Sequence, residues 1–176
     1  MAVIKHHKQV KLICGLIGKS EDTFKRACRV LSKRFGKIDF KSRLIEFDHT
    51  AYYQRELGTG LKRQFLSFQR LIKPELLPGI KIITNRLEKK SLPSFKDRNR
   101  WINIDPGYIT EAKLILATTR NYQHRIYLSK GIYAEVTLRF ASGSFQPHEW
   151  TYPDYKSEEY AIIFNQIRKI YLTNLQ

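Results

Sequence analysis

The sequence predicts an α+β fold, with a mostly antiparallel sheet, helices packed mainly on one face, a βαβ start and a C-terminal helix. Two observations support this fold class. Strand-like and helix-like segments alternate in the first third of the chain, whereas the second half holds short apolar runs that follow one another closely. Consecutive strands with short connections favour antiparallel pairing. A length of 176 residues suits one hydrophobic core, so we expect a single globular α+β domain over residues 1–176.

The first elements predict a βαβ unit. Residues 8–17 form a short apolar run that is typical of a central strand. Ser20 is expected to cap a helix that continues to about Phe35 and ends at Gly36. A second strand is expected over residues 43–47. This order is compatible with a ferredoxin-like opening half.

The middle of the chain is expected to be helical. Residues 51–72 carry apolar side chains at helical spacing, with an interruption around residues 58–60. A further helix is predicted from Pro74 to about Lys90, because proline fits the first turn of a helix. Its regular part is expected to begin near Ile80.

The second half is expected to be rich in strands and to close with a helix. Residues 100–104 alternate as a strand does, and residues 105–107, Asp-Pro-Gly, predict a turn. Residues 113–119 predict another strand. The last helix is expected from Ser157 to about Thr173.

Residues 123–138 predict a β-hairpin in which Gly131 closes a three-residue loop. This register pairs Leu128 with Ile132 and Tyr127 with Tyr133, and strand alternation then assigns each side chain to a face. The face expected in the core holds Ile126, Leu128, Ile132, Ala134, Val136 and Leu138. The other face is both aromatic and charged, which makes it the leading candidate for a site; it holds Arg125, Tyr127, Tyr133, Glu135, Thr137 and Arg139.

The strongest compositional feature is charge. The chain has 32 Lys plus Arg against 16 Asp plus Glu, a formal net charge of +16. Such a surface attracts phosphates, so RNA, DNA or a nucleotide is the expected partner. The alternative is that the charges simply solvate the surface, because they lie on the outer faces of several predicted helices rather than in one block.

Other features limit the class of protein. No apolar run approaches 20 residues, so we expect no membrane partner. The amino-terminal segment lacks the apolar stretch of a secretion signal. Cys14 and Cys28 give no disulfide framework, and we expect a cytoplasmic location. The oligomeric state stays open.

The segment from Gly15 to Ser20 resembles a phosphate-binding loop only in part. Such a loop needs a glycine five positions before the Gly-Lys-Ser triplet, and Ile13 stands there. Ser20 is therefore interpreted as a helix cap, and GTP is not expected as a ligand. The histidines and cysteines show no zinc-ligand spacing, and no metal ligands are assigned.

Polar residues at the ends of predicted elements form the candidate site. Carboxylates beside a histidine and an arginine suit acid/base chemistry and are also compatible with a divalent metal. The candidate catalytic residues are Asp105, His124, Arg125 and Glu135. The candidate ligand-binding residues are Tyr52, Tyr53, Glu56, Asn85, Glu88, Asn103, Tyr127, Tyr133 and Asp154. Each also has a structural interpretation; Arg125 and Glu135, for example, suit a cross-strand ion pair.

Several motifs resemble those of the family called domain of unknown function 4416. They are Thr50–Gly58, Thr84–Glu88, Asn103–Tyr108, His124–Leu128, Gly131–Glu135 and Trp150–Tyr155. The likeness covers nearly the whole chain and implies that these polar motifs belong together. Some members of that family carry a GTP-binding description, which the incomplete loop at Gly15–Ser20 does not support.

Three functions remain in competition. The leading one is binding of a phosphate-bearing ligand, nucleic acid or nucleotide, with a base stacked on the hairpin face around Tyr127 and Tyr133. The first alternative is a small phosphate-ester hydrolase, which requires Asp105, His124, Arg125 and Glu135 to meet in one pocket. The second is a structural subunit of a complex, whose aromatic face is covered by a partner or by residues 150–155.

Overall fold

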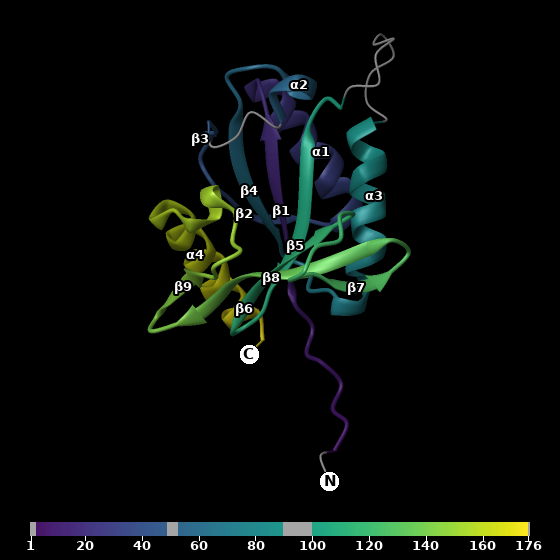
Figure 1. Ribbon diagram of the computed structural model, residues 1–176, viewed down its shortest axis with the longest axis vertical. Coiled ribbons are helices and arrows are strands. Elements are labelled where there is room, and N and C mark those ends of the chain that lie inside the picture. Colours follow the sequence, from purple (N-terminus) through teal and green to yellow (C-terminus); the bar gives the residue numbers. More distant parts are fainter. Residues whose placement is uncertain (1–2, 49–52, 90–99, 176) are drawn as a thin grey trace.

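The structure is a computed structural model that describes residues 3–48, 53–89 and 100–175 (Figure 1). Its centre is a 9-stranded sheet in which neighbouring strands are antiparallel. The strands are β1 (Lys11–Gly18), β2 (Ile38–Lys41), β3 (Ile45–Glu46), β4 (Lys62–Phe68), β5 (Asn103–Ile109), β6 (Lys113–Thr118), β7 (Ile126–Ser129), β8 (Ile132–Ala141) and β9 (Ser144–Pro147). The helices are α1 (Glu21–Phe35), α2 (Gln54–Leu57), α3 (Leu77–Lys89) and α4 (Glu158–Asn174), with 3₁₀ turns η2 (Pro74–Leu76) and η3 (Pro153–Lys156). The predicted α+β class with a C-terminal helix is confirmed.

The first half has the ferredoxin-like arrangement that its predicted order allowed. The elements β1-α1-β2-β4-α3-β5 place their strands in the order β2-β4-β1-β5. Because β4 is antiparallel to both β1 and β2, it separates two parallel strands joined by α1. This is a split βαβ unit. The predicted βαβ start is therefore confirmed.

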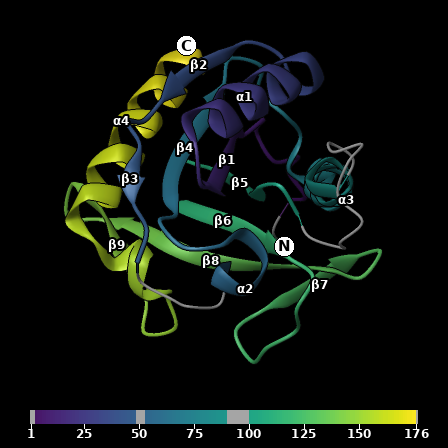
Figure 2. The same ribbon diagram turned by 90° about the horizontal axis from the view of Figure 1, so that it is seen from above.

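The second half extends the same sheet and covers its other side. Strands β6, β8 and β7 continue beyond β5, while β3 pairs with β4 and β9 with β8. Helices α1 and α3 pack on one face, against a core that includes Leu12 and Leu66. Helix α4 packs on the other face, against Ile13 and Phe65 (Figure 2). Two of the three long helices thus share a face, and the helix predicted last covers the opposite one.

The predicted helix ends are confirmed at two helices. The Ser20 side chain accepts a hydrogen bond from the Thr23 amide at 3.3 Å, and Gly36 ends α1 with φ of 101°. Ser157 caps α4 in the same way, accepting from the Tyr160 amide at 3.3 Å. Side-chain oxygens at these positions satisfy amides that have no partner inside the helix.

The predicted helix over residues 51–72 is wrong for most of its length. In the described part of this range, residues 53–72, the α-helical residues are those of α2, and β4 is a strand paired with β1 on one side and with β2 and β3 on the other. Phe65 belongs to the α4 core and Phe68 to the α1 core, on opposite faces of the sheet. A central strand with both faces buried lacks the alternation of polar and apolar residues that marks a half-exposed strand. The apolar residues of β4 also happen to fall at helical spacing, which explains the wrong prediction.

The observed bounds of three other elements differ from the predicted ones by a few residues. The second strand was expected over residues 43–47, but the chain there forms the short β3, and β2 precedes it. Helix α3 begins at Leu77 rather than near Ile80, because Pro78 lies in the first turn, where no amide donor is needed. The strand expected over residues 100–104 is β5 and begins at Asn103.

The predicted turn at residues 105–107 is wrong, because these residues lie inside β5. Strand β5 pairs with β1 along its whole length, but with β6 only from Gly107 onward. Pro106 has no amide hydrogen to donate, and it stands where β6 is not paired. A Cβ at Gly107 would lie 2.2 Å from the Ile115 carbonyl oxygen, so glycine permits the close approach of the two backbones. β5 and β6 therefore diverge at Gly107, and we call this divergence the fork of the sheet.

The predicted hairpin is formed by β7 and β8, with one change at the turn. Tyr127 pairs with Tyr133 as expected, but Ser129 rather than Leu128 opposes Ile132. Lys130 and Gly131 both have positive φ, at 55° and 74°. A two-residue turn with a bulge therefore replaces the expected three-residue loop.

The predicted apolar face of the hairpin is divided. A second register shift, between Val136 and Leu138, moves Leu138 into the α4 core, while Ile132 stays in the core beside α3. Ile126 is 69% exposed and Leu128 38% exposed, because β7 is the last strand of the sheet order. The prediction that these two residues lie in the core is wrong.

None of the helices in the described ranges is long and apolar enough to cross a membrane.

Candidate functional site

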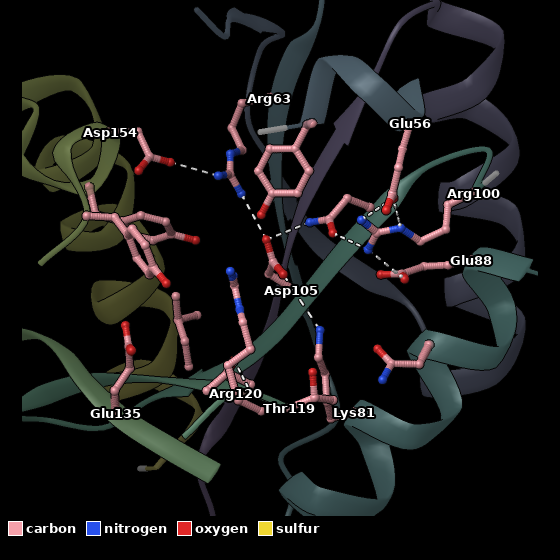
Figure 3. A pocket seen from close by; sticks show the side chains of 18 of the residues that line it. Glu56, Arg63, Lys81, Glu88, Arg100, Asp105, Thr119, Arg120, Glu135 and Asp154 are labelled. Carbon is pink, nitrogen blue, oxygen red and sulfur yellow. Dashed lines mark hydrogen bonds and ion pairs between the residues drawn. The ribbon is translucent and has the colours of Figure 1, made fainter. Parts of the chain in front are cut away.

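A pocket of about 720 Å³ lies at the fork between β5 and β6 (Figure 3). This volume falls in the range of roughly 300–1,000 Å³ that small-molecule sites occupy. Helix α3, strand β4 and the segment after β9 complete its walls. The lining residues are Phe47, Tyr53, Glu56, Arg63, Lys81, Asn85, Glu88, Lys89, Arg100, Asn103, Asp105, Leu116, Ala117, Thr118, Thr119, Arg120, Arg125, Glu135, Tyr152, Pro153, Asp154 and Tyr155.

Most of the residues singled out from the sequence meet in this pocket, although they come from distant parts of the chain. Those that line it are Tyr53, Glu56, Asn85, Glu88, Asn103, Asp105, Arg125, Glu135 and Asp154. Three others, His124, Tyr127 and Tyr133, do not line it. Tyr52 lies outside the described residues.

Arg63, on β4, forms the floor of the pocket. Its Nη2 donates to Asp154 Oδ2 at 2.7 Å and its Nη1 lies 3.5 Å from Asp105 Oδ2. The guanidinium also lies over the Phe47 ring, 4.9 Å from its centroid. Burial alone lowers the pKa of Arg63, but the surrounding Tyr155 and carboxylates raise it more, so the guanidinium keeps its charge.

Gly15, which suggested a phosphate loop, instead makes room for this floor. A Cβ there would lie 3.0 Å from Arg63 Nη1 and 3.2 Å from Tyr155 Oη. The Gly-Lys-Ser triplet that follows ends β1 and caps α1, and Gly18, Lys19 and Ser20 are not among the lining residues.

Asp105 stands at the centre of the pocket among cationic side chains. Besides Arg63, Lys81 Nζ lies 3.7 Å from its Oδ1, and Asn103 Nδ2 donates to its Oδ2 at 2.7 Å. Arg120 points toward the same carboxylate from the side of β6 (Figure 3). The Asp105 side chain is 23% exposed, so a ligand in the pocket can reach it.

Arg100 holds together a second group at the rim. It contacts Glu56 at 2.6 Å, Glu88 at 3.1 Å and the Asn103 side-chain oxygen at 2.8 Å. Glu88 also accepts the Ile104 amide hydrogen at 2.7 Å, and burial raises the pKa of its carboxyl. These candidates therefore connect α2, α3 and β5 through Arg100.

Arg125 is committed to the protein rather than open to a ligand. Its Nε donates to Glu135 Oε2 at 2.8 Å, its Nη1 to the Arg120 carbonyl at 3.1 Å and its Nη2 to Tyr152 Oη at 2.6 Å. This is the cross-strand pair that the sequence allowed, with two further contacts. Arg125 therefore fixes the backbone of Arg120, which the hydrolase hypothesis did not anticipate.

His124 contacts Glu135 from outside the pocket. Its Nε2 lies 3.2 Å from Glu135 Oε2, the same oxygen that Arg125 contacts. The imidazole stacks on Trp150 at 5.6 Å between ring centroids and borders a second groove of about 640 Å³. The hydrolase hypothesis needed His124 in the same pocket as Asp105, so the geometry does not support its role as proton carrier.

Tyr127 and Tyr133 form a pair away from the pocket. Their ring centroids lie 5.3 Å apart at an interplanar angle of 68°, and Tyr127 is 57% exposed. The hairpin face expected to hold the ligand thus contributes Glu135 and Arg125 to the pocket, but neither of its tyrosines. The tyrosines that do line it are Tyr53, Tyr152 and Tyr155.

Sequence reasoning missed most of the cations in the pocket, namely Arg63, Lys81, Lys89, Arg100 and Arg120. Arg63 lies in β4, within the range that the sequence predicts to be helical. The others were not separated from the many Lys and Arg residues of the chain. Among the residues that the structure describes, no group of three or more His, Cys, Asp or Glu could hold a metal ion.

Comparison with known proteins agrees with the resemblance found in the sequence. A family model described as domain of unknown function, DUF4416, matches residues 8–171. The comparison with curated proteins and the comparison with solved structures gave no match. Because the match spans nearly the whole chain, the chain belongs to the DUF4416 family.

Proposed function

We propose that the pocket at the fork of the sheet binds a phosphate-bearing ligand of about the size of a nucleotide. The observation that carries this proposal is the gathering of Arg63, Lys81 and Arg120, from three different elements, around Asp105. Convergent cations from separate elements are typical of sites that bind phosphate.

The charge of the lining supports an anionic ligand. Its cationic residues are Arg63, Lys81, Lys89, Arg100, Arg120 and Arg125, and its anionic residues are Glu56, Glu88, Asp105, Glu135 and Asp154. Four of the carboxylates, Glu56, Glu88, Glu135 and Asp154, are in contact with an arginine that fixes them. The six cations exceed the five carboxylates by one, and Lys81 lies 3.7 Å from the fifth carboxylate, Asp105. In a partly buried site such a surplus attracts an anion more strongly than it would in bulk water.

The overall charge of the chain supports the same conclusion. A net charge of +16 raises the local concentration of anionic ligands and speeds their association. Because exposed charges are screened by salt, we expect the association rate and the affinity to fall as ionic strength rises. The pocket then supplies the specific contacts.

Isothermal titration calorimetry at low salt tests the proposal directly. The ligands are inorganic phosphate and the nucleoside mono- and triphosphates, titrated into the wild type, into Arg120→Gln and into Arg34→Gln. Both variants lose one positive charge, but Arg34 lies exposed on α1 and does not line the pocket. We expect Arg120→Gln to weaken binding about tenfold, the effect of one charged hydrogen bond, and Arg34→Gln to change it little. Absence of binding by the wild type to every one of these ligands at low salt would overturn the proposal.

Hydrolysis of a phosphate ester is the second candidate, and the exposure of Asp105 favours it. A carboxylate that a ligand can reach, beside cations that would neutralise developing charge, suits a base that activates water. Release of inorganic phosphate from nucleotides and simple phosphate esters distinguishes the two. Asp105→Asn should abolish that release while binding persists; if the wild type binds and releases nothing, binding is the whole function.

A further inference from the structure

We propose that the ligand is single-stranded nucleic acid, with one nucleotide in the pocket and its neighbours stacked on an aromatic rim beside it. This inference rests on the proposed function, because the pocket is where the first nucleotide binds. The aromatic rim consists of Tyr122, Trp150 and Tyr152.

Among the described residues, three of the ten exposed large apolar side chains form this rim, and three more lie on the edge strand β7. Tyr122 is 61% exposed, Trp150 42% and Tyr152 40%. Ile126, Tyr127 and Leu128, on the neighbouring edge strand, are exposed as well. Exposed apolar side chains that gather in one place mark sites of binding more often than ordinary surface does.

The rim is continuous with the pocket. Tyr152 lines the pocket itself, and Tyr122 stands two residues after Arg120. The Tyr122 ring packs edge-on against His124 at 5.4 Å, and the Trp150 ring stacks on both His124 and His148. A strand that leaves the pocket past Tyr152 therefore reaches this aromatic surface, where Tyr122, 61% exposed, offers the most open ring for stacking.

The rim is also held in place before any ligand arrives. Trp150 Nε1 donates to the Val136 carbonyl at 3.0 Å, and Tyr152 Oη accepts from Arg125 at 2.6 Å. At Tyr122 the backbone is fixed, because its carbonyl accepts the Arg125 amide hydrogen at 2.9 Å, and the ring rests edge-on against His124. Rings that are already fixed lose little conformational entropy when a base stacks on them, so they suit a binding platform.

The chemistry of the rim favours a single strand over other ligands. A free nucleotide has one base and cannot use rings outside the pocket, whereas a strand presents further bases. A duplex keeps its bases stacked inside and offers no face to these rings. Exposed aromatic residues also occur at protein interfaces, but the net charge of +16 complements a polyanion and disfavours a second copy of the chain.

Fluorescence anisotropy with labelled oligonucleotides tests the inference. The probes are an eight-nucleotide single strand, the duplex of the same sequence and, as competitor, the corresponding mononucleotide, all at one low salt concentration. We expect the single strand to bind at least about tenfold more tightly than either the mononucleotide or the duplex. Equal affinity for single strand and mononucleotide would overturn the inference and leave the proposed function standing.

Substitutions in the rim separate stacking from charge. Tyr122→Ala should weaken binding of the single strand about tenfold and leave mononucleotide binding unchanged, whereas Tyr122→Phe, which keeps the ring, should bind as the wild type does. An unchanged single-strand affinity in Tyr122→Ala contradicts the proposal, as does a dimer in sedimentation analysis that the oligonucleotide does not displace. Absence of binding by single strand and mononucleotide alike would instead overturn the proposed function itself.

Discussion

The two walls of the pocket have similar composition but differ in how far their polar groups are already paired. The β5 wall, named for Asp105, also holds Arg63 from β4 and Lys81 from α3. The β8 wall, named for Glu135, also holds Arg125, which precedes β7, and Tyr152, which follows β9. On the β8 wall the Glu135 side chain is 2% exposed and contacts Arg125, His124 and Thr137. On the β5 wall the Asp105 side chain is 23% exposed beside cations that face the pocket.

This difference shows why residue type alone does not identify a site. Both walls place arginine beside a carboxylate, which from the sequence looks equally suited to acid/base chemistry. The β8 wall uses its hydrogen bonds to join β7, β8 and the segment after β9, so we interpret it as structural support. The β5 wall retains reachable charge, so we interpret it as the ligand-binding side.

The largest expected effect is on stability, at the floor of the β5 wall. Arg63→Met leaves the Asp154 carboxylate, whose side chain is 9% exposed, without its cation. Breaking a buried pair from one side costs about 3–5 kcal/mol of the free energy of unfolding. Urea denaturation measures it, with Arg34→Met as the surface control, expected within about 0.5 kcal/mol of the wild type. A loss below about 1 kcal/mol would mean that the floor is solvated and not a buried ion pair.

A smaller loss is expected where the same floor meets β1. Gly15→Ala introduces a Cβ about 3 Å from Arg63 and Tyr155, and overpacking of this kind costs about 1–3 kcal/mol. Gly79→Ala is the matched control, because the added Cβ would meet no atom within 4 Å apart from its chain neighbours and the nearby backbone of its own helix. Thermal denaturation of the two variants compares them. If both melt at the same temperature, the account of Gly15 is wrong.

A substitution in the β8 wall should lower the stability of the protein and change its ligand affinity only weakly. Glu135→Gln removes the charge that Arg125 and His124 share, in a site where the carboxylate is buried. We expect a loss of about 2 kcal/mol in the free energy of unfolding, since a hydrogen-bonded charge is replaced by a neutral amide. Calorimetry with the nucleotide should give an affinity within about threefold of the wild type. A complete loss of binding in a folded Glu135→Gln variant would place Glu135 among the ligand contacts.

The smallest expected effect is the pH dependence of stability that Glu88 contributes, in the group held together by Arg100. Burial raises the pKa of Glu88 above the ordinary value of 4.5. The folded state therefore binds this proton more tightly than the unfolded state does, and stability from this group falls as pH rises through the folded pKa. Urea denaturation of the wild type and of Glu88→Gln at successive pH values isolates the contribution of Glu88 to the free energy of unfolding. Their difference in free energy should change with pH above 4.5 in favour of the variant, and a constant difference would contradict the shift.

Sequence patterns predicted the parts of the fold that local chemistry decides. Ser20, Gly36 and Ser157 mark helix ends because capping depends on a few neighbouring residues. Strand β4 was missed because a strand with both faces buried has no periodic signal of its own. Residues 105–107 were taken for a turn because Pro and Gly serve turns more often than the forking of a sheet.

The candidate site was predicted only in part, because its acidic residues stand out in this chain and its basic residues do not. Acidic residues are few in this chain, so Asp105, Glu135 and Asp154 stood out at the ends of elements. The cations were lost among 32 Lys and Arg residues. Lys81 and Arg120 could be recognised as pocket residues only from the structure, in which α3 and the end of β6 border the same pocket.

The affinity of Asp105→Asn for a nucleoside monophosphate tests the central claim most directly. If the cations of the β5 wall hold the phosphate, removing the more exposed carboxylate among them, Asp105, should tighten binding about tenfold, because a nearby repulsive charge is lost. Calorimetry at low salt, beside Glu135→Gln, measures this effect. Tighter binding by Asp105→Asn is the result that the account predicts, and weaker or unchanged binding would contradict it.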